Sequence, residues 1–224
     1  MKKYSVFILV FLAILILGCT QVQLSEKSPQ SVAQSMTVEE VIEKMKERYN
    51  NFQDLQGIVN MSMKVENTTM YEVGRFIVKK PDKFRVESKE LLYISNGKVI
   101  WLYNKVTNEY TVANISNIDK PETLISKIGY GFLFDVFNNS KKKLLSVGKF
   151  KDKECYLIVV PPTNENPRKI QVWVDKQELY PLKVEISGNQ TIVITYEDVK
   201  FNSGVSDELF NFTPPEGAKM LKPS

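Results

Sequence analysis

The apolar residues divide the chain into three parts with different expected structures. Residues 4–17 are almost unbroken apolar sequence behind a positively charged start, Met1-Lys2-Lys3, which is the pattern of an export signal peptide. The run is shorter than the roughly 20 residues that cross a bilayer core, so a signal over residues 1–18 is favoured over a permanent transmembrane helix. Residues 19–36 are polar without a sustained period and are expected to form a flexible tether. Residues 37–224 are periodic and are expected to fold as one domain.

One amphipathic helix is predicted over residues 38–51. Thr37 and Glu40 have the spacing of a capping box, in which each side chain satisfies a backbone N–H of the other. Apolar residues then recur every three or four positions, which predicts a helix with one face on the core; they are Val38, Val41, Ile42, Met45, Tyr49 and Phe52.

After Gly57 the period changes from the helical one to the two-residue alternation of β-strands. The pattern predicts an antiparallel meander of about ten strands, so the expected fold class is α+β, mostly β. The candidate strands are residues 58–65, 71–80 and 83–88, the two arms of a hairpin over residues 92–101, and residues 109–115, 144–150, 154–160, 169–175, 182–187 and 191–201.

The strongest local turn signal is Asn96-Gly97, which favours a two-residue hairpin. That hairpin would set Leu92 opposite Trp101 and Ile94 opposite Val99. Both of its faces are apolar, so both must be covered by other parts of the protein.

A second helix is predicted to open at Asp119 and to run through an apolar stretch that extends to Phe137. This stretch is too apolar for a surface helix, and Gly129 and Gly131 weaken it by about 1 kcal/mol each relative to alanine. Two interpretations remain open. The segment is either a core helix that covers one face of the sheet or a movable lid over a cavity.

Composition excludes several classes of function. The chain has 43% hydrophobic and 25% charged residues, as globular domains do. Its net charge of +4 falls to +2 once Lys2 and Lys3 are assigned to the signal, so no nucleic-acid partner is expected. Histidine is absent, which removes histidine-dependent nucleophiles and histidine-ligated zinc.

Other catalytic signals are missing as well. The sequence has no phosphate-binding glycine loop, Gly-x-Ser-x-Gly motif, Cys-x-x-Cys motif or acidic calcium loop. We therefore expect no enzyme, no cofactor and no metal site. Of the two cysteines, Cys155 lies in an apolar run and is expected to be a buried free thiol; a Cys19–Cys155 disulfide is the weaker alternative.

Cys19 directly follows Gly18 and the apolar run, an arrangement that resembles the lipobox of bacterial and archaeal lipoproteins. The resemblance implies cleavage before Cys19 and attachment of a thioether-linked lipid to its thiol, with acyl chains such as palmitate. The protein would then be anchored on the extracytoplasmic face of the cell membrane. Plain secretion and an uncleaved anchor are the alternatives.

Three separated stretches, residues 74–86, 92–104 and 210–218, resemble the LolA family of lipoprotein carriers in the same order and at similar spacing. The resemblance implies an unclosed antiparallel β-barrel of about ten strands, covered by an N-terminal helix and a mid-chain lid helix. In these carriers an apolar cavity accepts lipoprotein acyl chains, which are passed to the membrane-bound LolB. The residues implied for the cavity here are Phe76, Phe84, Val86, Trp101, Leu124, Ile128 and Phe132.

Lys80 stands where the bacterial carriers have an arginine that latches the lid. A lysine keeps the charge but loses the planar donor fork, which implies a weaker or differently built latch. An anchor at Cys19 also departs from a freely shuttling carrier and is closer to LolB or to anchored sensors of the same fold.

The leading hypothesis is therefore a membrane-anchored lipoprotein that binds an acyl chain or another hydrophobic ligand in an apolar half-barrel, with a membrane-protein partner possible. The alternative is an extracytoplasmic sensor or scaffold that binds a protein partner. In that case large side chains would fill the cavity; the candidates are Trp101, Phe132, Phe134 and Phe137.

Overall fold

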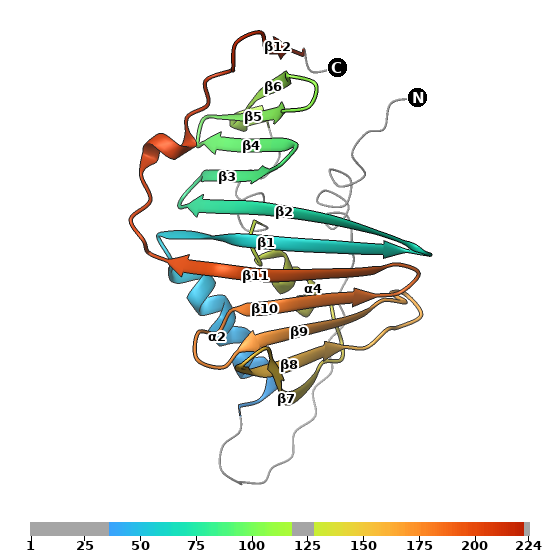
Figure 1. The fold of residues 1–224 in the computed structure, drawn as a ribbon. Coiled ribbons are helices and arrows are strands. Elements are labelled where there is room, and N and C mark those ends of the chain that lie inside the picture. Colours follow the sequence, from blue (N-terminus) through green and yellow to red (C-terminus); the bar gives the residue numbers. More distant parts are fainter. Residues whose placement is uncertain (1–35, 118–127, 222–224) are drawn as a thin grey trace.

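The computed structural model describes residues 36–117 and 128–221, and its strands form a single twelve-stranded sheet (Figure 1). The strand order is β12-β6-β5-β4-β3-β2-β1-β11-β10-β9-β8-β7, and β12 and β7 do not pair with each other. Neighbours are antiparallel except for β12, which pairs with β6 in parallel. The sheet is therefore an unclosed barrel, as predicted, with more strands than the expected ten.

The elements follow the chain in a meander that is interrupted once by helix. Their bounds are α2 (Val38–Asn51), β1 (Asp54–Val65), β2 (Thr68–Lys79), β3 (Lys83–Ser88), β4 (Leu91–Asn96), β5 (Val99–Asn104), β6 (Glu109–Asn114), η1 (Ile115–Asn117), α4 (Phe132–Asn138), β7 (Leu144–Phe150), β8 (Lys153–Val160), β9 (Lys169–Asp175), β10 (Pro181–Ser187), β11 (Thr191–Phe201), η2 (Asp207–Phe210) and β12 (Lys219–Met220).

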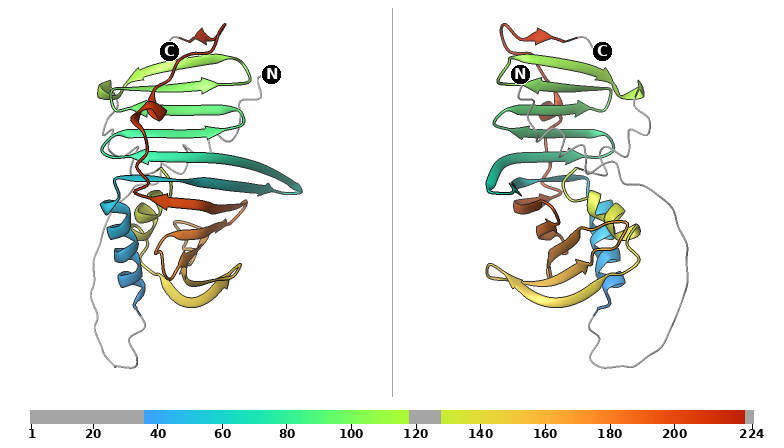
Figure 2. Two further views of the ribbon diagram at one scale, coloured as in Figure 1. Left: turned by 60° about the vertical axis from the view of Figure 1, so that its left-hand side comes forward. Right: turned by 90° about the vertical axis from the view of Figure 1, so that its right-hand side faces the viewer.

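Helix α2 begins and ends where the periodicity predicts. The Thr37 hydroxyl accepts the N–H of Glu40, and the Glu40 carboxylate accepts the N–H of Thr37, so the capping box is confirmed. Its buried residues are Val41, Ile42, Met45 and Tyr49. They face the sheet, where α2 and α4 lie together against the half that runs from β11 to β7 (Figures 1 and 2).

The other half of the sheet, from β2 to β6, is covered on the opposite face by the C-terminal segment (Figure 2). We call residues 202–221 the strap. Phe210 of the strap is fully buried against Ile77, Leu92 and Ile94, which form a second, smaller core. The expectation that both faces of the β4–β5 hairpin are covered is confirmed, because Ile100 belongs to the main core on the other face.

The strap is fixed at its start by Asp54, which is 4% exposed. Its carboxylate accepts the N–H and hydroxyl of Ser203, both at 2.8 Å, the N–H of Gly204 at 3.0 Å and that of Val205. Burial pushes the pKa of Asp54 upward, but these hydrogen bonds outweigh burial and leave the pKa below its ordinary value. The carboxylate is thus held in its charged form, in which it accepts from all four donors.

The register predicted for the β4–β5 hairpin was wrong by two residues. Ser95 pairs with Ile100 and Ile94 with Trp101, so Gly97 and Lys98, rather than Asn96 and Gly97, stand at the tip between the strands. The Asn96 side chain accepts the N–H groups of Lys98 and Val99, and Gly97 takes the positive φ of +89°. An even shift leaves every side chain on its predicted face.

Cys155 is a free and fully buried thiol, as predicted. The predicted signal, Cys19 and most of the tether lie outside the described residues. Within residues 36–117 and 128–221, no helix is both long and apolar enough to cross a bilayer.

Candidate functional site: the apolar inner face of the sheet

The face of the sheet that carries α2 and α4, here called the inner face, is apolar across several strands. Phe76 on β2 pairs with Val86 on β3, and Val86 pairs with Tyr93 on β4, so these three side chains form a row. Phe84 is fully buried beside this row, with its ring centroid 4.8 Å from that of Tyr93. The alternation of β3 thus builds a continuous aromatic and aliphatic strip.

Residues 128–131 lead into α4, and Gly129 among them lies against the Phe76 end of this strip. The Tyr49 hydroxyl of α2 donates to the carbonyl oxygen of Ile128 at 2.7 Å, and the Tyr196 hydroxyl of β11 donates to that of Gly129 at 3.0 Å. Gly129 has a φ of +70°, and a Cβ there would stand 3.3 Å from the Phe76 ring. Two phenols therefore hold a backbone segment that only glycine fits without adjustment.

Helix α4 is short and largely apolar. It has seven residues, its N-cap Gly131 makes no side-chain capping bond, and Phe132, Leu133 and Phe137 are buried. Their burial in the main core makes α4 the cover of the inner face near β11 and β1. A short helix without a side-chain cap is held chiefly by this packing.

An aromatic cluster joins α2, the segment before α4, and α4 itself. The Tyr49 ring lies edge-on to Tyr130 and Phe134, with centroids 4.9 and 5.5 Å away. Burial raises the pKa values of Tyr49, Tyr130 and Tyr196 well above the ordinary phenol value. These phenols are therefore neutral, and those of Tyr49 and Tyr196 act as hydrogen-bond donors. The Tyr130 hydroxyl is itself buried and lacks a partner among the described atoms.

Lys80 contacts the C-terminal end of α2. Its ammonium donates to the carbonyl oxygens of Tyr49 at 3.2 Å and Asn50 at 2.5 Å and lies 4.4 Å from the centre of the Phe52 ring. A cation there stabilises the unpaired carbonyl groups of a helix C-terminus, while burial lowers the pKa of Lys80. Lys80 thus fixes the helix whose Tyr49 holds Ile128. The direct latch to a lid stays a prediction, since residues 118–127 lie outside the described part.

Of the predicted cavity residues, the structure brings Phe76, Phe84, Val86, Ile128 and Phe132 into one core. Leu124 lies outside the described residues.

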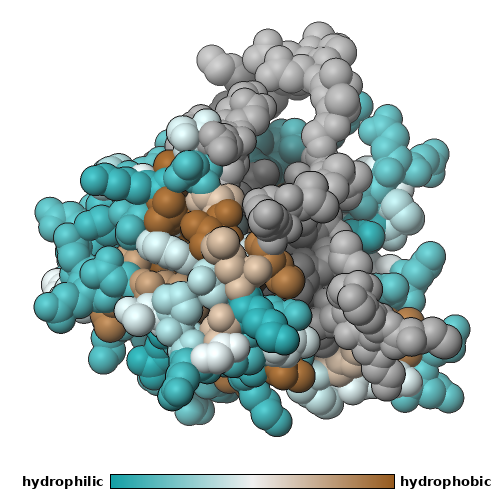
Figure 3. Space-filling model, turned by 90° about the horizontal axis from the view of Figure 1, so that it is seen from above, coloured by the Kyte–Doolittle hydropathy of each residue, from teal (hydrophilic) through white to brown (hydrophobic). Residues whose placement is uncertain are grey.

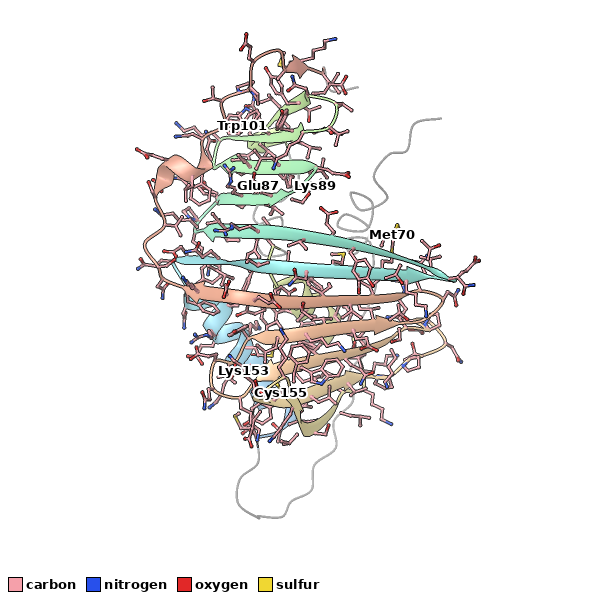
Figure 4. The ribbon with its side chains drawn as sticks, in the orientation of Figure 1. Met70, Glu87, Lys89, Trp101, Lys153 and Cys155 are labelled. Carbon is pink, nitrogen blue, oxygen red and sulfur yellow. The ribbon has the colours of Figure 1, made fainter. Side chains whose placement is uncertain are left out.

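Trp101 is placed differently from that group. It packs against Phe212 on the strap side of the sheet, in the second core, near the β12 end and far along the sheet from Cys155 (Figure 4). The structure therefore does not place Trp101 among the inner-face residues. Because both faces of its hairpin are apolar, alternation alone could not assign it to one face.

Two hollows bounded by described residues lie away from the inner-face strip. One of about 380 Å³ lies beside the end of α2, between Arg48, Phe52 and Phe201, and one of about 250 Å³ lies between Val73, Arg75 and Lys105. Among the described residues no group of three or more acidic or cysteine side chains could hold a metal ion. The chemistry available on the inner face is apolar contact with a few neutral phenols.

A family comparison agrees with this architecture. The model of the family described as outer membrane lipoprotein carrier protein LolA matches residues 60–213, which is more than half of the chain. The chain belongs to the LolA family. Among its relatives, an uncharacterised protein of Methanocaldococcus jannaschii is 30% identical over 194 residues, which is 84% of this chain and 55% of that protein. This chain thus spans about half the length of that relative.

A second LolA-family relative, an outer-membrane lipoprotein carrier protein of Francisella philomiragia, is 27% identical over 154 residues, covering 66% of this chain and 70% of that protein. Among solved structures, an uncharacterised conserved protein from Thermus thermophilus superposes with a TM-score of 0.54 at 11% identity, over 81% of this chain and 98% of that one. At this identity the likeness supports the fold alone.

The stretches that carry the LolA resemblance meet in space on the strap side. Ile77 comes from the first stretch, Leu92 and Tyr103 from the second, and Phe210 and Phe212 from the third, and all belong to the second core. Many residues that carry the LolA resemblance are therefore those through which the strap packs on the outer face of the sheet. The inner-face residues Phe84 and Val86 are in the first stretch too, on alternate positions.

Proposed function

We propose that the inner face of this LolA-family protein binds an acyl chain or another hydrophobic ligand. The observation that carries the proposal is the apolar strip of Phe76, Phe84 and Val86, with a glycine-containing segment against Phe76 and a short helix packed into the same core. The relative from Francisella philomiragia is a lipoprotein carrier by name, which makes lipoprotein acyl chains the first ligands to test. The proposal assigns the protein no enzymatic activity.

The energetics favour a ligand that displaces part of the cover. Each buried methylene contributes about 0.8 kcal/mol, so an acyl chain of a dozen or more carbons has on the order of 10 kcal/mol available. Lifting residues 128–131 would break two hydrogen bonds from phenols, at about 1 kcal/mol each net, and expose the buried side chains of α4. Release then requires only that the cover return to the strip.

A pair of valine substitutions on opposite faces tests the proposal. Val86 packs against the main core on the inner face, whereas Val73 on β2 is 58% exposed on the outer face. Val86→Glu should abolish binding of a fluorescent fatty acid, because a carboxylate cannot be desolvated in the strip without a partner. Val73→Glu should bind as the unsubstituted protein does. Equal binding by both variants, with melting curves showing both folded, would contradict the proposal.

Large aromatic side chains fill the centre of the main core, and this filling favours a second function. Tyr130, Phe84 and Phe137 are, together with Phe210 of the second core, the largest fully buried side chains of the described residues. A protein whose inner face is filled in this way could serve as an extracytoplasmic sensor or scaffold that binds a protein partner. Failure of the unsubstituted, folded protein to bind any acyl probe would favour this function over the carrier.

We further propose that a lipid on Cys19 anchors the protein to the extracytoplasmic face of the membrane. Gly18-Cys19 after the apolar run supports this assignment, and two acyl chains give the stable attachment that one chain does not. Cys19→Ser should release the protein from the membrane fraction if the signal is cleaved, and mass spectrometry of the mature N-terminus should report the lipid. Unchanged membrane retention of Cys19→Ser, together with no lipid mass on the N-terminus of the unsubstituted protein, would rule out this anchor.

A further inference from the structure

The end of the sheet formed by β7 carries a concentration of positive charge. Residues 136–151 include five lysines and no acidic residue. Three of the lysines, Lys141, Lys142 and Lys143, come directly before β7, while Lys149 lies on it and Lys151 follows it. Within the described residues β7 pairs only with β8, so this basic strand forms an outer edge of the sheet.

Most of this charge is not neutralised within the described part of the chain. Lys151 pairs with Glu197 at 3.0 Å, whereas Lys143 donates to the carbonyl oxygens of Phe137 and Ser140, which carry no net charge. The exposed Lys141, Lys142 and Lys149 make no ion pair with any described residue; Lys149 lies opposite Glu154 on β8, but that carboxylate pairs with Lys176. The β7 edge therefore presents net positive charge to its surroundings.

Apolar side chains are exposed between these lysines. Val147 is 64% exposed and Leu144 is 49% exposed, both on β7. An edge that combines several lysines with exposed aliphatic side chains has the composition of surfaces that lie in the interface of an anionic bilayer.

The opposite end of the sheet provides a contrast. Seen from the β12 end, apolar side chains are exposed within a largely hydrophilic surface (Figure 3), and Val106 there is 71% exposed. Its charges are of both signs, because Glu87 pairs with Lys105 and Arg85, and Glu109 lies opposite Lys219 on β12. That end has exposed apolar area without a run of consecutive lysines.

The direction of the chain adds an independent observation. Helix α2 begins at the β7 end of the sheet and runs toward β1 and β2 (Figures 1 and 2), where Lys80 contacts its last residues. Residues 1–35, with their apolar run and Cys19, precede this start. The N-terminal attachment therefore enters the domain at the same end as the lysines.

We propose that the β7 edge docks the domain on an anionic lipid surface, so that the sheet stands upright on the membrane with β12 farthest away. The inference rests on the membrane anchor proposed above. A tether of about 17 residues spans on the order of 20–25 Å and keeps the edge at a high effective concentration near the headgroups, so a weak surface affinity is sufficient. The occupant is the bilayer itself rather than a second protein.

Two matched cysteine variants test this orientation in the full-length protein with its N-terminal attachment intact. Val147→Cys and Val106→Cys replace comparably exposed valines at the two ends of the sheet, and each is labelled with the environment-sensitive fluorophore NBD; buried Cys155 is shielded from labelling. The labelled proteins are bound to vesicles of phosphatidylcholine with or without phosphatidylglycerol. The expected result is a blue-shifted NBD signal, quenched by lipid nitroxides, at position 147 only and only with phosphatidylglycerol.

Charge reversal provides the decisive variant. Loss of each lysine near an anionic surface lowers affinity about fivefold, so K141E/K142E/K149E should lower the docking equilibrium constant at least about a hundredfold, and raised salt should lower it too. Flotation with the vesicles monitors the anchor separately. If the protein floats but the NBD signal at position 147 stays that of an aqueous environment, the docking inference alone is wrong. The β7 edge would then be available for pairing with a strand of another protein. Protein that fails to float with either vesicle overturns the anchor, and the docking inference with it.

Discussion

Removing the two phenol hydroxyls that hold residues 128 and 129 shows whether this segment opens independently of the sheet. Tyr49→Phe and Tyr196→Phe delete the donors to the Ile128 and Gly129 carbonyl groups and keep the aromatic rings. A lid and a core helix respond differently. A lid loosens alone, whereas a core helix weakens together with the strands that it covers.

The expected free-energy cost of these substitutions follows from the burial of the two hydrogen bonds. Each hydrogen bond contributes about 1 kcal/mol net, and a carbonyl group left buried without a partner raises the cost of its loss to about 2 kcal/mol. One to two kcal/mol multiplies an opening equilibrium by about 5 to 30. Because the two acceptors are consecutive residues, the effects of the two substitutions need not add.

Hydrogen exchange with peptide-level mass spectrometry measures the opening directly. The double variant should exchange residues 128–138 at least about fivefold faster, while β9 and β10 keep their protection. Its affinity for a fluorescent fatty acid should rise, because lifting the cover then costs less. Tyr103→Phe is the matched control, since its hydroxyl donates to Asn108 on the strap side. Uniformly faster exchange across β9, β10 and α4 would refute the lid and identify α4 as a core helix.

Substitutions at three further positions separate stability from binding. Asp54→Asn should lower the free energy of unfolding by about 2–4 kcal/mol at neutral pH, measured by denaturant titration. Because the folded-state pKa of Asp54 lies below the unfolded value of about 3.9, the carboxylate's contribution is complete above that value and disappears as pH falls through the folded-state pKa; a pH-independent difference would contradict this. Phe210→Ala should destabilise by about 3–5 kcal/mol yet leave fatty-acid affinity unchanged in folded protein, and lost affinity would show that the strap takes part in binding. Lys80→Met should cost about 1–2 kcal/mol and Lys80→Arg much less, whereas equal melting temperatures for Lys80→Met and the unsubstituted protein would show that the contact with the end of α2 is not stabilising.

Local patterns predicted the elements that local interactions determine. The capping box and helical stripe gave the bounds of α2, and alternation gave most strands, because side-chain period and caps depend on neighbours in sequence. The predicted hairpin at Asn96-Gly97 failed in register because the Asn96 side chain accepts two backbone N–H groups and so keeps Asn96 out of the tip. Turn propensity alone does not distinguish these two arrangements.

Long-range placement could be predicted only in part. Phe84 and Val86 were expected on the inner face through family resemblance, whereas the face of Trp101 depends on the strap, whose Phe212 comes from more than 100 positions later in the chain. Tyr49 and Tyr196 fit ordinary core positions in the pattern. Nothing in that pattern indicates that their hydroxyls reach carbonyl groups 79 and 67 residues away.

Native mass spectrometry of protein purified from its own membrane in mild detergent tests the central claim most directly. We expect an acyl-lipid adduct on the unsubstituted protein and on Val73→Glu, and none on the folded Val86→Glu variant. The same spectra report the mass of any lipid on Cys19, which separates the anchor from the ligand. An unsubstituted protein that carries no adduct, or an adduct that persists in Val86→Glu, would contradict ligand binding on the inner face.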